Sequence, residues 1–131
     1  MQDLIDDFLK QKRFVVAGSF KNESKYAYRI VKTLKNKGYE IYPVNPHLKQ
    51  VEGLACYASV KHIPGVVDVV DIVTPPEVTK KILRECREKG ITRVWLQPGA
   101  ESEEAIKFCE ENDIKVIYGL CVMLESIGNK Q

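Results

Sequence analysis

Short apolar runs alternate with amphipathic segments along this chain, and that alternation limits its fold more than any other feature. The runs are rich in Val, Ile and aromatic residues, and they have the length of strands that are covered on both faces. They occupy residues 13–17, 39–44, 66–73, 92–96 and 114–118. Strands that alternate with helices form a parallel sheet joined by right-handed crossovers. The sequence therefore predicts the α/β class.

The segments between the strands have the apolar spacing of helices that cover a sheet. Apolar residues three, four or seven positions apart share one helix face. Such faces are formed by Ala27, Ile30, Val31 and Leu34, by Val78, Ile82, Leu83 and Cys86, and by Ala105, Ile106 and Cys109. Gly38 and Gly90 stand where a left-handed residue ends a helix, and Ser102 stands where a cap begins one. A further helix over residues 4–10 is expected to pack outside this core.

Together these elements predict a Rossmann-like, doubly wound architecture. We expect a mostly parallel sheet of five to six strands with helices on both faces. A short strand near residues 54–57 would be the sixth and would give the strand order 3-2-1-4-5-6. The 131 residues suit a single domain, expected to span residues 1–131. In such a sheet a ligand binds outside the carboxyl ends of the strands, where the strand order reverses.

Charge and composition exclude several classes of function. A net charge of +2 is too small for a nucleic-acid surface, and Asp68 and Asp71 interrupt the longest apolar run, so no membrane span is expected. An acidic start without a basic region, and cysteines without a CxxC pair, favour a cytoplasmic protein with reduced thiols. Asp68 and Asp71 point to opposite faces of one strand, so they cannot form a catalytic pair. We expect Asp71 to accept hydrogen bonds from turn backbone.

The turn after the first strand is a candidate phosphate site. Gly18 lets the backbone approach a phosphate, and the helix that follows offers unpaired N–H groups. Ser19 adds a hydroxyl and Lys21 a charge, with Phe20 between them. The alternative is that Gly18 only makes a tight strand-to-helix turn, because the full G-x-G-x-x-G pattern is absent.

The residues at the end of the second strand help to distinguish between the candidate nucleotides. NAD-binding proteins use an acidic residue there to hold the ribose hydroxyls, whereas residues 43–49 contain none. Asn45 can hydrogen-bond a ribose or an adenine edge, and Lys49 can neutralise a ribose phosphate. Coenzyme A (CoA) and NADP both carry such a phosphate, so charge does not separate them. A solvated loop lysine without a ligand is the alternative for Lys49.

Two motifs are fairly specific in combination, Gly-Tyr-x-x-x-Pro-Val-Asn-Pro at 38–46 and Trp-x-Gln-x-Gly at 95–99, and Ala-Gly-Ser at 17–19 accompanies them. With them, residues 13–125 resemble the small stand-alone CoA-binding domains, akin to the CoA-binding domain of succinyl-CoA synthetase. The resemblance implies that CoA lies across the strand ends. It implies that Gly18 and Ser19 contact the pyrophosphate, and that Asn45, Pro46 and Lys49 surround the adenosine and its phosphate. It further implies that the opposite wall is formed by Thr74, Pro75 and Pro76. The pantetheine arm would pass Gln97 and Gly99.

Cys121 follows the last strand, in the Cys-x-x-x-Glu arrangement with Glu125 that this family often shows. A thiol near the start of a helix can react, and it could exchange with the CoA thiol. The alternative is a small residue packed under the last helix. Cys56, Cys86 and Cys109 are expected in the core, whereas His47 and His62 lie in loops.

We therefore expect a protein that binds CoA or an acyl-CoA without catalysis of its own. The alternative is an NADP- or CoA-binding subunit of an enzyme such as an acyl-CoA ligase. The expected ligand is a small molecule, and neither nucleic acid nor a membrane is an expected partner. A second copy of the chain and a ligase subunit are both left open as protein partners.

Overall fold

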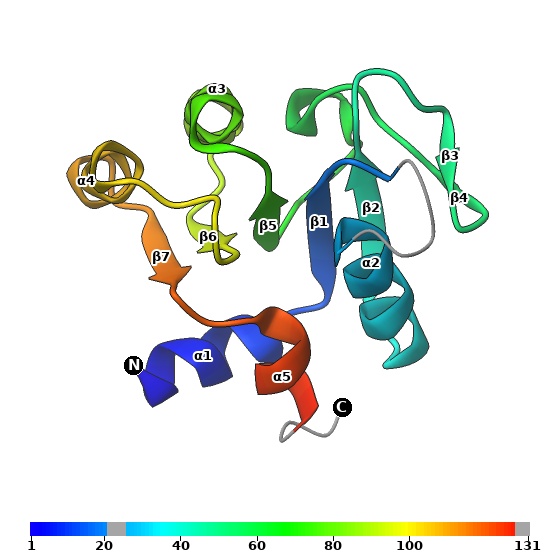
Figure 1. Cartoon of the computed structure of the whole chain (residues 1–131), viewed down its shortest axis with the longest axis horizontal. Coiled ribbons are helices and arrows are strands. Elements are labelled where there is room, and N and C mark those ends of the chain that lie inside the picture. Colours follow the sequence, from blue (N-terminus) through cyan, green and yellow to red (C-terminus); the bar gives the residue numbers. More distant parts are fainter. Residues whose placement is uncertain (21–25, 128–131) are drawn as a thin grey trace.

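The computed structural model describes residues 1–20 and 26–127. In this part of the chain, five strands form one parallel sheet in the order β2-β1-β5-β6-β7 (Figure 1). The strands are β1 (Arg13–Gly18), β2 (Glu40–Val44), β5 (Val69–Val73), β6 (Arg93–Leu96) and β7 (Lys115–Tyr118). The order reverses between β1 and β5, as in a doubly wound sheet. The predicted Rossmann-like α/β class is confirmed.

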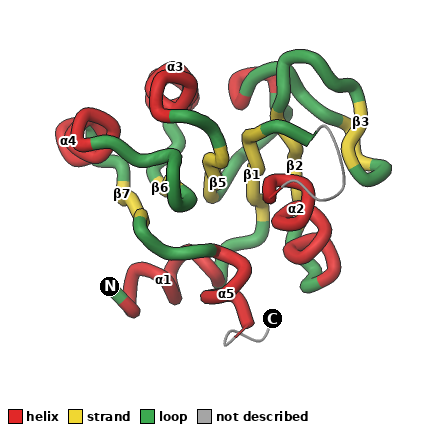
Figure 2. The backbone as a smooth tube through the Cα atoms, viewed as in Figure 1, coloured by secondary structure: helices red, strands yellow, loops and turns green. Residues whose placement is uncertain are grey.

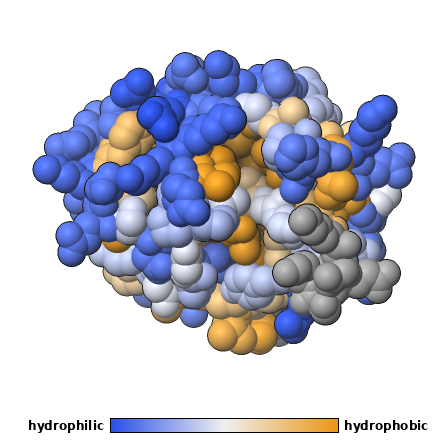
Figure 3. Space-filling view, turned by 45° about the horizontal axis from the view of Figure 1, so that its top comes forward, coloured by the Kyte–Doolittle hydropathy of each residue, from blue (hydrophilic) through white to orange (hydrophobic). Residues whose placement is uncertain are grey.

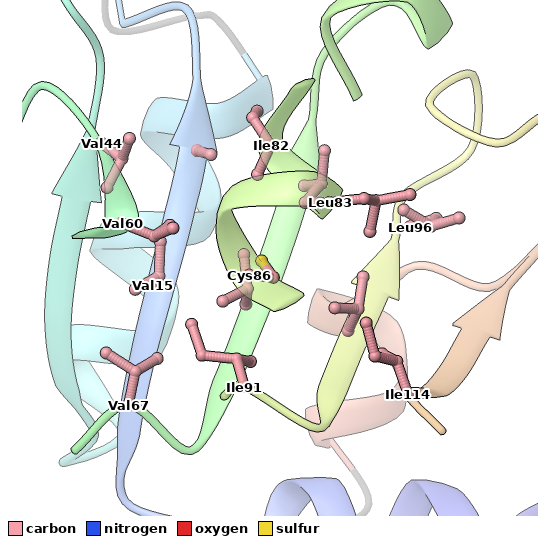
Figure 4. Packing of buried hydrophobic residues seen from close by; sticks show 14 of the residues in the cluster. Val15, Val44, Val60, Val67, Ile82, Leu83, Cys86, Ile91, Leu96 and Ile114 are labelled. Atoms are coloured by element: carbon pink, nitrogen blue, oxygen red, sulfur yellow. The ribbon is translucent and has the colours of Figure 1, made fainter. Parts of the chain in front are cut away.

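Helices cover both faces of the sheet (Figure 2). One layer contains α1 (Gln2–Leu9), α2 (Tyr26–Asn36) and α5 (Val122–Ile127), and the other contains α3 (Pro76–Lys89), α4 (Glu103–Glu111) and the 3₁₀ turn η1 (Val60–His62). Figure 4 shows the second layer, in which Val15 of the sheet lies among Val60, Ile82 and Cys86. The described residues contain no helix long and apolar enough to cross a bilayer. The face seen in Figure 3 is largely hydrophilic, with apolar residues in separate patches.

The expected sixth strand is reduced to a single bridge. Residues 50–55 fold back on themselves as an antiparallel hairpin of β3 (Gln50–Val51) and β4 (Leu54–Ala55). Its turn residues Glu52 and Gly53 have φ values of 53° and 74°, and a tight two-residue hairpin of type I′ needs positive φ at both positions. Tyr57 then forms one parallel bridge with Val44, beside β2. The expected strand order holds for the other five strands.

The opening helix belongs to the core, which corrects the expectation that it packs outside. Ile5, Phe8 and Leu9 of α1 are all buried, and their spacing gives the helix one apolar stripe. Phe8 meets Trp95 of β6 edge-on, with ring centroids 6.1 Å apart. The hydroxyl of Tyr39 donates a hydrogen bond to the Leu9 carbonyl at 2.6 Å. The helix therefore covers the sheet beside α5.

The predicted helix ends are confirmed. The Ser102 hydroxyl accepts a hydrogen bond from the Ala105 amide at 3.0 Å, and Gly90 ends α3 in the left-handed conformation. The predicted face of α3 is wrong at one position, because Val78 is exposed and the neighbouring Thr79 is buried. The Thr79 hydroxyl lies 2.9 Å from that of Thr74 and 3.2 Å from the Pro75 carbonyl, so it caps the turn that leads into the helix.

Candidate functional site

A cavity of about 250 Å³ lies at the carboxyl ends of β1, β2 and β5, beside α3. Its walls combine apolar side chains with a few polar groups. The lining residues are Ala17, Gly18, Ser19, Val44, Asn45, Pro46, Ala58, Val73, Thr74, Pro75, Val78, Lys81, Ile82 and Glu85. This is the edge of the sheet that the strand order selects.

A second, more open groove of about 470 Å³ adjoins this cavity. Val73, Thr74 and Pro75 line both, so the end of β5 forms the shared wall. The groove continues past Pro76 to Pro98, Gly99 and Ala100 after β6, with Tyr26 at the start of α2 on its other side. Together the two hollows form an extended surface across the strand ends from β2 to β6.

Gly18 is required by packing. A Cβ atom at Gly18 would lie 2.8 Å from the Cβ of Ala27, closer than real Cβ contacts, and 3.0 Å from the Val73 carbonyl oxygen, which is tighter than most. The missing side chain lets α2 pack closely on β1. The turn interpretation of Gly18 therefore has direct support, although the same residue lines the cavity.

Gly18→Ala should destabilise the protein by about 1–3 kcal/mol, the usual cost of overpacking a core. Urea unfolding followed by circular dichroism measures the loss. The double variant Gly18→Ala/Ala27→Gly is the matched control, because it removes one of the two crowded atoms and should recover part of the stability. An unchanged midpoint for Gly18→Ala would show that this packing is loose.

Asn45 joins the ends of β1 and β2. Its side-chain amide donates a hydrogen bond to the Gly18 carbonyl at 2.8 Å, and its oxygen accepts one from the His47 amide at 2.8 Å. These bonds fix the cavity rim, and among the described residues the second side-chain N–H of Asn45 has no hydrogen-bond partner and is open to a ligand. The chemistry of such a side chain suits a ribose or adenine edge.

A buried polar network lies beneath the groove. The Gln97 side chain donates to Asp71 Oδ1 at 2.5 Å and accepts from the Tyr26 hydroxyl at 2.9 Å and the Val122 amide at 3.2 Å. Burial raises the pKa of Asp71 to about 8, against the lowering effect of the Gln97 bond. Asp71 therefore accepts its hydrogen bond from the Gln97 side chain. The expectation that it accepts from turn backbone is wrong, because the Gln97 amide is the group that reaches it.

Two of the expected ligand contacts are placed inside the protein. Gln97 is fully buried, and Phe20 is only 6% exposed and packs in the core on the α2 face. Tertiary packing covers Gln97 completely and leaves little of Phe20 exposed. As ligand contacts, both stay predictions.

The remaining predicted residues divide between the rim and its surroundings. Gly18, Ser19, Asn45, Pro46, Thr74, Pro75, Pro76 and Gly99 line the cavity or the groove. Lys49 is exposed and is not among the lining residues, and Lys21 lies outside the described residues. Cys121 is half-buried against the Tyr26 hydroxyl. As ligand contacts, all of these stay predictions.

Comparison with known proteins identifies the family. A family model described as a CoA binding domain matches residues 12–127. The chain belongs to the CoA-binding domain family. It is 32% identical over 130 residues to the alpha subunit of an ADP-forming acetate–CoA ligase II from Pyrococcus furiosus, covering 91% of this chain and 28% of that subunit. The chain thus spans less than a third of that relative.

Solved structures of similar size share the fold of this CoA-binding domain. A conserved hypothetical protein from Pyrococcus furiosus is 42% identical, with a TM-score of 0.84 over 88% of this chain and 99% of that one. A hypothetical protein from Pyrococcus horikoshii is 30% identical, with a TM-score of 0.93 over 98% and 91% of the two chains. Relatives nearly coextensive with this CoA-binding domain therefore exist.

The cavity residues fit the chemistry of an adenine nucleotide. Val44, Val73 and Ile82 provide apolar walls for a flat ring, and Asn45 provides an amide donor on the cavity wall. The exposed Lys81 provides a positive charge for a phosphate. No cluster of three metal-ligating side chains occurs in residues 1–20 and 26–127.

Sequence reasoning missed the contribution of α3 to the cavity. Val78, Lys81, Ile82 and Glu85 all line it. Their spacing of three, four and seven residues places them on one helix face, so a helical projection could have identified them. Tyr26 was also missed, because nothing in the local sequence links it to Gln97 or Cys121.

Proposed function

We propose that this CoA-binding domain binds CoA or an acyl-CoA at the carboxyl ends of its strands, without catalysis of its own. The observation that supports the proposal best is the pair of adjoining hollows. A nucleotide with a long arm needs a compact pocket that opens into an extended path. The cavity beside Asn45 suits the adenosine, and the groove between Pro75 and Tyr26 suits the pantetheine arm.

In this arrangement the residues of the chain bind and orient. Ser19 and the remaining Asn45 N–H face the nucleotide as hydrogen-bond donors, and Lys81 neutralises a phosphate. Among the described residues, the titratable side chains on the cavity wall are Lys81 and Glu85. CoA supplies the reactive thiol at the far end of its arm, and the groove directs that arm towards Tyr26.

CoA should raise the melting temperature. A ligand at about 100 times its dissociation constant adds about 2.7 kcal/mol, which corresponds to roughly 10 °C for a domain of this size. The measurement is differential scanning fluorimetry or calorimetry with CoA, dephospho-CoA, NAD and NADP under reducing conditions. Dephospho-CoA and NAD should give smaller shifts. The proposal is rejected if millimolar CoA gives none.

A cavity-filling variant tests where the ligand lies. Ala58→Trp places a large side chain on the cavity wall and should abolish most of the CoA shift. Ala55→Trp is the matched control, because Ala55 is also exposed but is not among the cavity residues. Equal CoA-induced shifts of the melting temperature in both variants would show that the ligand lies outside this cavity.

The second candidate function is a nucleotide-binding subunit of an enzyme such as an acyl-CoA ligase. The observation that favours it is the similarity to the alpha subunit of an ADP-forming acetate–CoA ligase, of which this chain spans 28%. A larger thermal shift with NADP than with CoA, or co-purification with a ligase chain, would favour this function over simple CoA binding.

A further inference from the structure

Cys121 is held in place through both of its neighbours. The indole N–H of Trp95 donates to the Leu120 carbonyl at 2.9 Å, and the Val122 amide donates to Gln97 Oε1 at 3.2 Å. Both Trp95 and Gln97 are fully buried. The backbone of Cys121, a half-buried residue, is therefore fixed relative to the sheet.

Tyr26 connects this thiol to the groove. The Tyr26 side chain lines the groove, and its hydroxyl contacts both Cys121 Sγ and Gln97 Oε1. A hydroxyl has one proton to donate. When it donates to Gln97, its oxygen can accept the thiol proton. When the sulfur is ionised, the hydroxyl can turn and donate to it.

A buried carboxyl oxygen completes the cluster. Asp71 Oδ2 is inaccessible to solvent and has no hydrogen-bond partner among the described residues. The pKa of Tyr26 is raised, first by burial, then by Cys121, and further by the charge of Asp71. Asp71 and the Tyr26 hydroxyl both bond to the Gln97 side chain, so Gln97 links the buried carboxyl to the hydroxyl that contacts Cys121. A buried polar group without a partner is costly and calls for an explanation beyond packing.

The other three cysteines lack these features. Cys86 and Cys109 are buried, and burial raises the pKa of both. Cys56 is half-buried, its thiol points to the Asn45 carbonyl, and burial raises its pKa as well. Cys121, by contrast, is hydrogen-bonded to Tyr26, a side chain that lines the groove.

We propose that Cys121 is a thiol-exchange site for the disulfide form of CoA, guided to it by the groove; the proposal rests on the proposed function. The Cys121 thiolate attacks one sulfur of CoA disulfide, so that a Cys121–CoA bond forms and the original S–S bond breaks. The second CoA leaves with the electron pair of the broken bond and takes up a proton. The proton lost by Cys121 passes to solvent. The protein would then carry CoA covalently until a thiol releases it.

Intact mass spectrometry tests this proposal. Reduced protein mixed with CoA disulfide should gain the mass of one CoA less two hydrogens, and dithiothreitol should remove it. Cys121→Ser should abolish the adduct, whereas Cys56→Ser, the matched control at the other half-buried cysteine, should retain it. An adduct that survives in Cys121→Ser, or one on several cysteines, overturns the proposal.

Two further measurements test the roles of the groove and of Tyr26. Glutathione disulfide, which lacks the nucleotide, should react at least about tenfold more slowly than CoA disulfide, and equal rates overturn guidance by the groove. Tyr26→Phe keeps the ring and removes the hydroxyl, so it should slow the exchange about tenfold, the effect of losing one hydrogen bond to a charged atom. An unchanged exchange rate would show that the Tyr26 hydroxyl takes no part in the exchange.

The wild-type thermal shift separates the two proposals. If CoA raises the melting temperature under reducing conditions but CoA disulfide forms no adduct, the exchange proposal alone is wrong. If neither effect is observed, the proposed CoA binding is rejected as well.

Discussion

Replacing Asp71 with Asn should stabilise the protein at about pH 9 by up to about 5 kcal/mol and remove most of the fall in stability between about pH 5 and 8. Asp71 is fully buried, and burial raises its pKa to about 8. In the unfolded chain an aspartate has a pKa of about 3.9. Between these two values the folded protein keeps the proton and the unfolded chain loses it.

Folding therefore takes up a proton in this range, and the free energy of unfolding falls as the pH rises. The slope is about 1.4 kcal/mol for each pH unit, and it flattens above the folded pKa, where both states are ionised. Asn has nearly the same shape, can accept the hydrogen bond from Gln97, and never ionises. The variant and the wild type should thus be similar at about pH 4 and diverge as the pH rises.

Urea unfolding at a series of pH values measures the effect. Asp68→Asn is the matched control, because Asp68 lies just before the same strand but is half-buried and accepts hydrogen bonds from the Lys12 and Arg13 amides. It should keep the wild-type slope between about pH 5 and 8. An unchanged slope in Asp71→Asn would show that another group causes the dependence.

The strand order and helix ends could be predicted because they depend on local patterns. Runs such as residues 13–17 and 92–96 are apolar throughout, and each covered strand in a parallel sheet has this signature. Gly90 and Ser102 end and begin helices through their own backbone and side chain. The sequence also indicated the edge of the sheet at which the cavity lies, since strand order alone selects it.

The internal support of the site could not be predicted in this way. Gln97 follows a strand directly, as rim residues do, yet packing of α2 and α5 over it makes it a buried bonding centre. The network joins Tyr26, Asp71, Gln97 and Cys121, which lie up to 95 positions apart in the sequence. The wrong expectation that α1 packs outside the core has the same cause. Phe8 packs against Trp95, which lies far from it in the sequence.

Trp95→Ala should be among the most destabilising single changes, at about 3–5 kcal/mol, the range for truncating a buried large aromatic residue. Trp95 of β6 is fully buried on the face of the sheet that α1 covers, and its ring meets that of Phe8 edge-on. Its indole also donates to the Leu120 carbonyl, so truncation leaves both a cavity and an acceptor without its donor. Urea unfolding followed by far-ultraviolet circular dichroism measures the loss, since the single Trp fluorophore is removed.

Trp95→Phe separates packing from hydrogen bonding. It keeps most of the ring volume and removes the donor to Leu120, so it should cost about 1–3 kcal/mol, the penalty for an unsatisfied buried polar group. Because that bond fixes the residue before Cys121, the backbone of residues 119–121 should also exchange amide hydrogens faster than in wild type. If both variants lose equal stability and this exchange is unchanged, packing alone holds the segment, and the indole bond does not position Cys121.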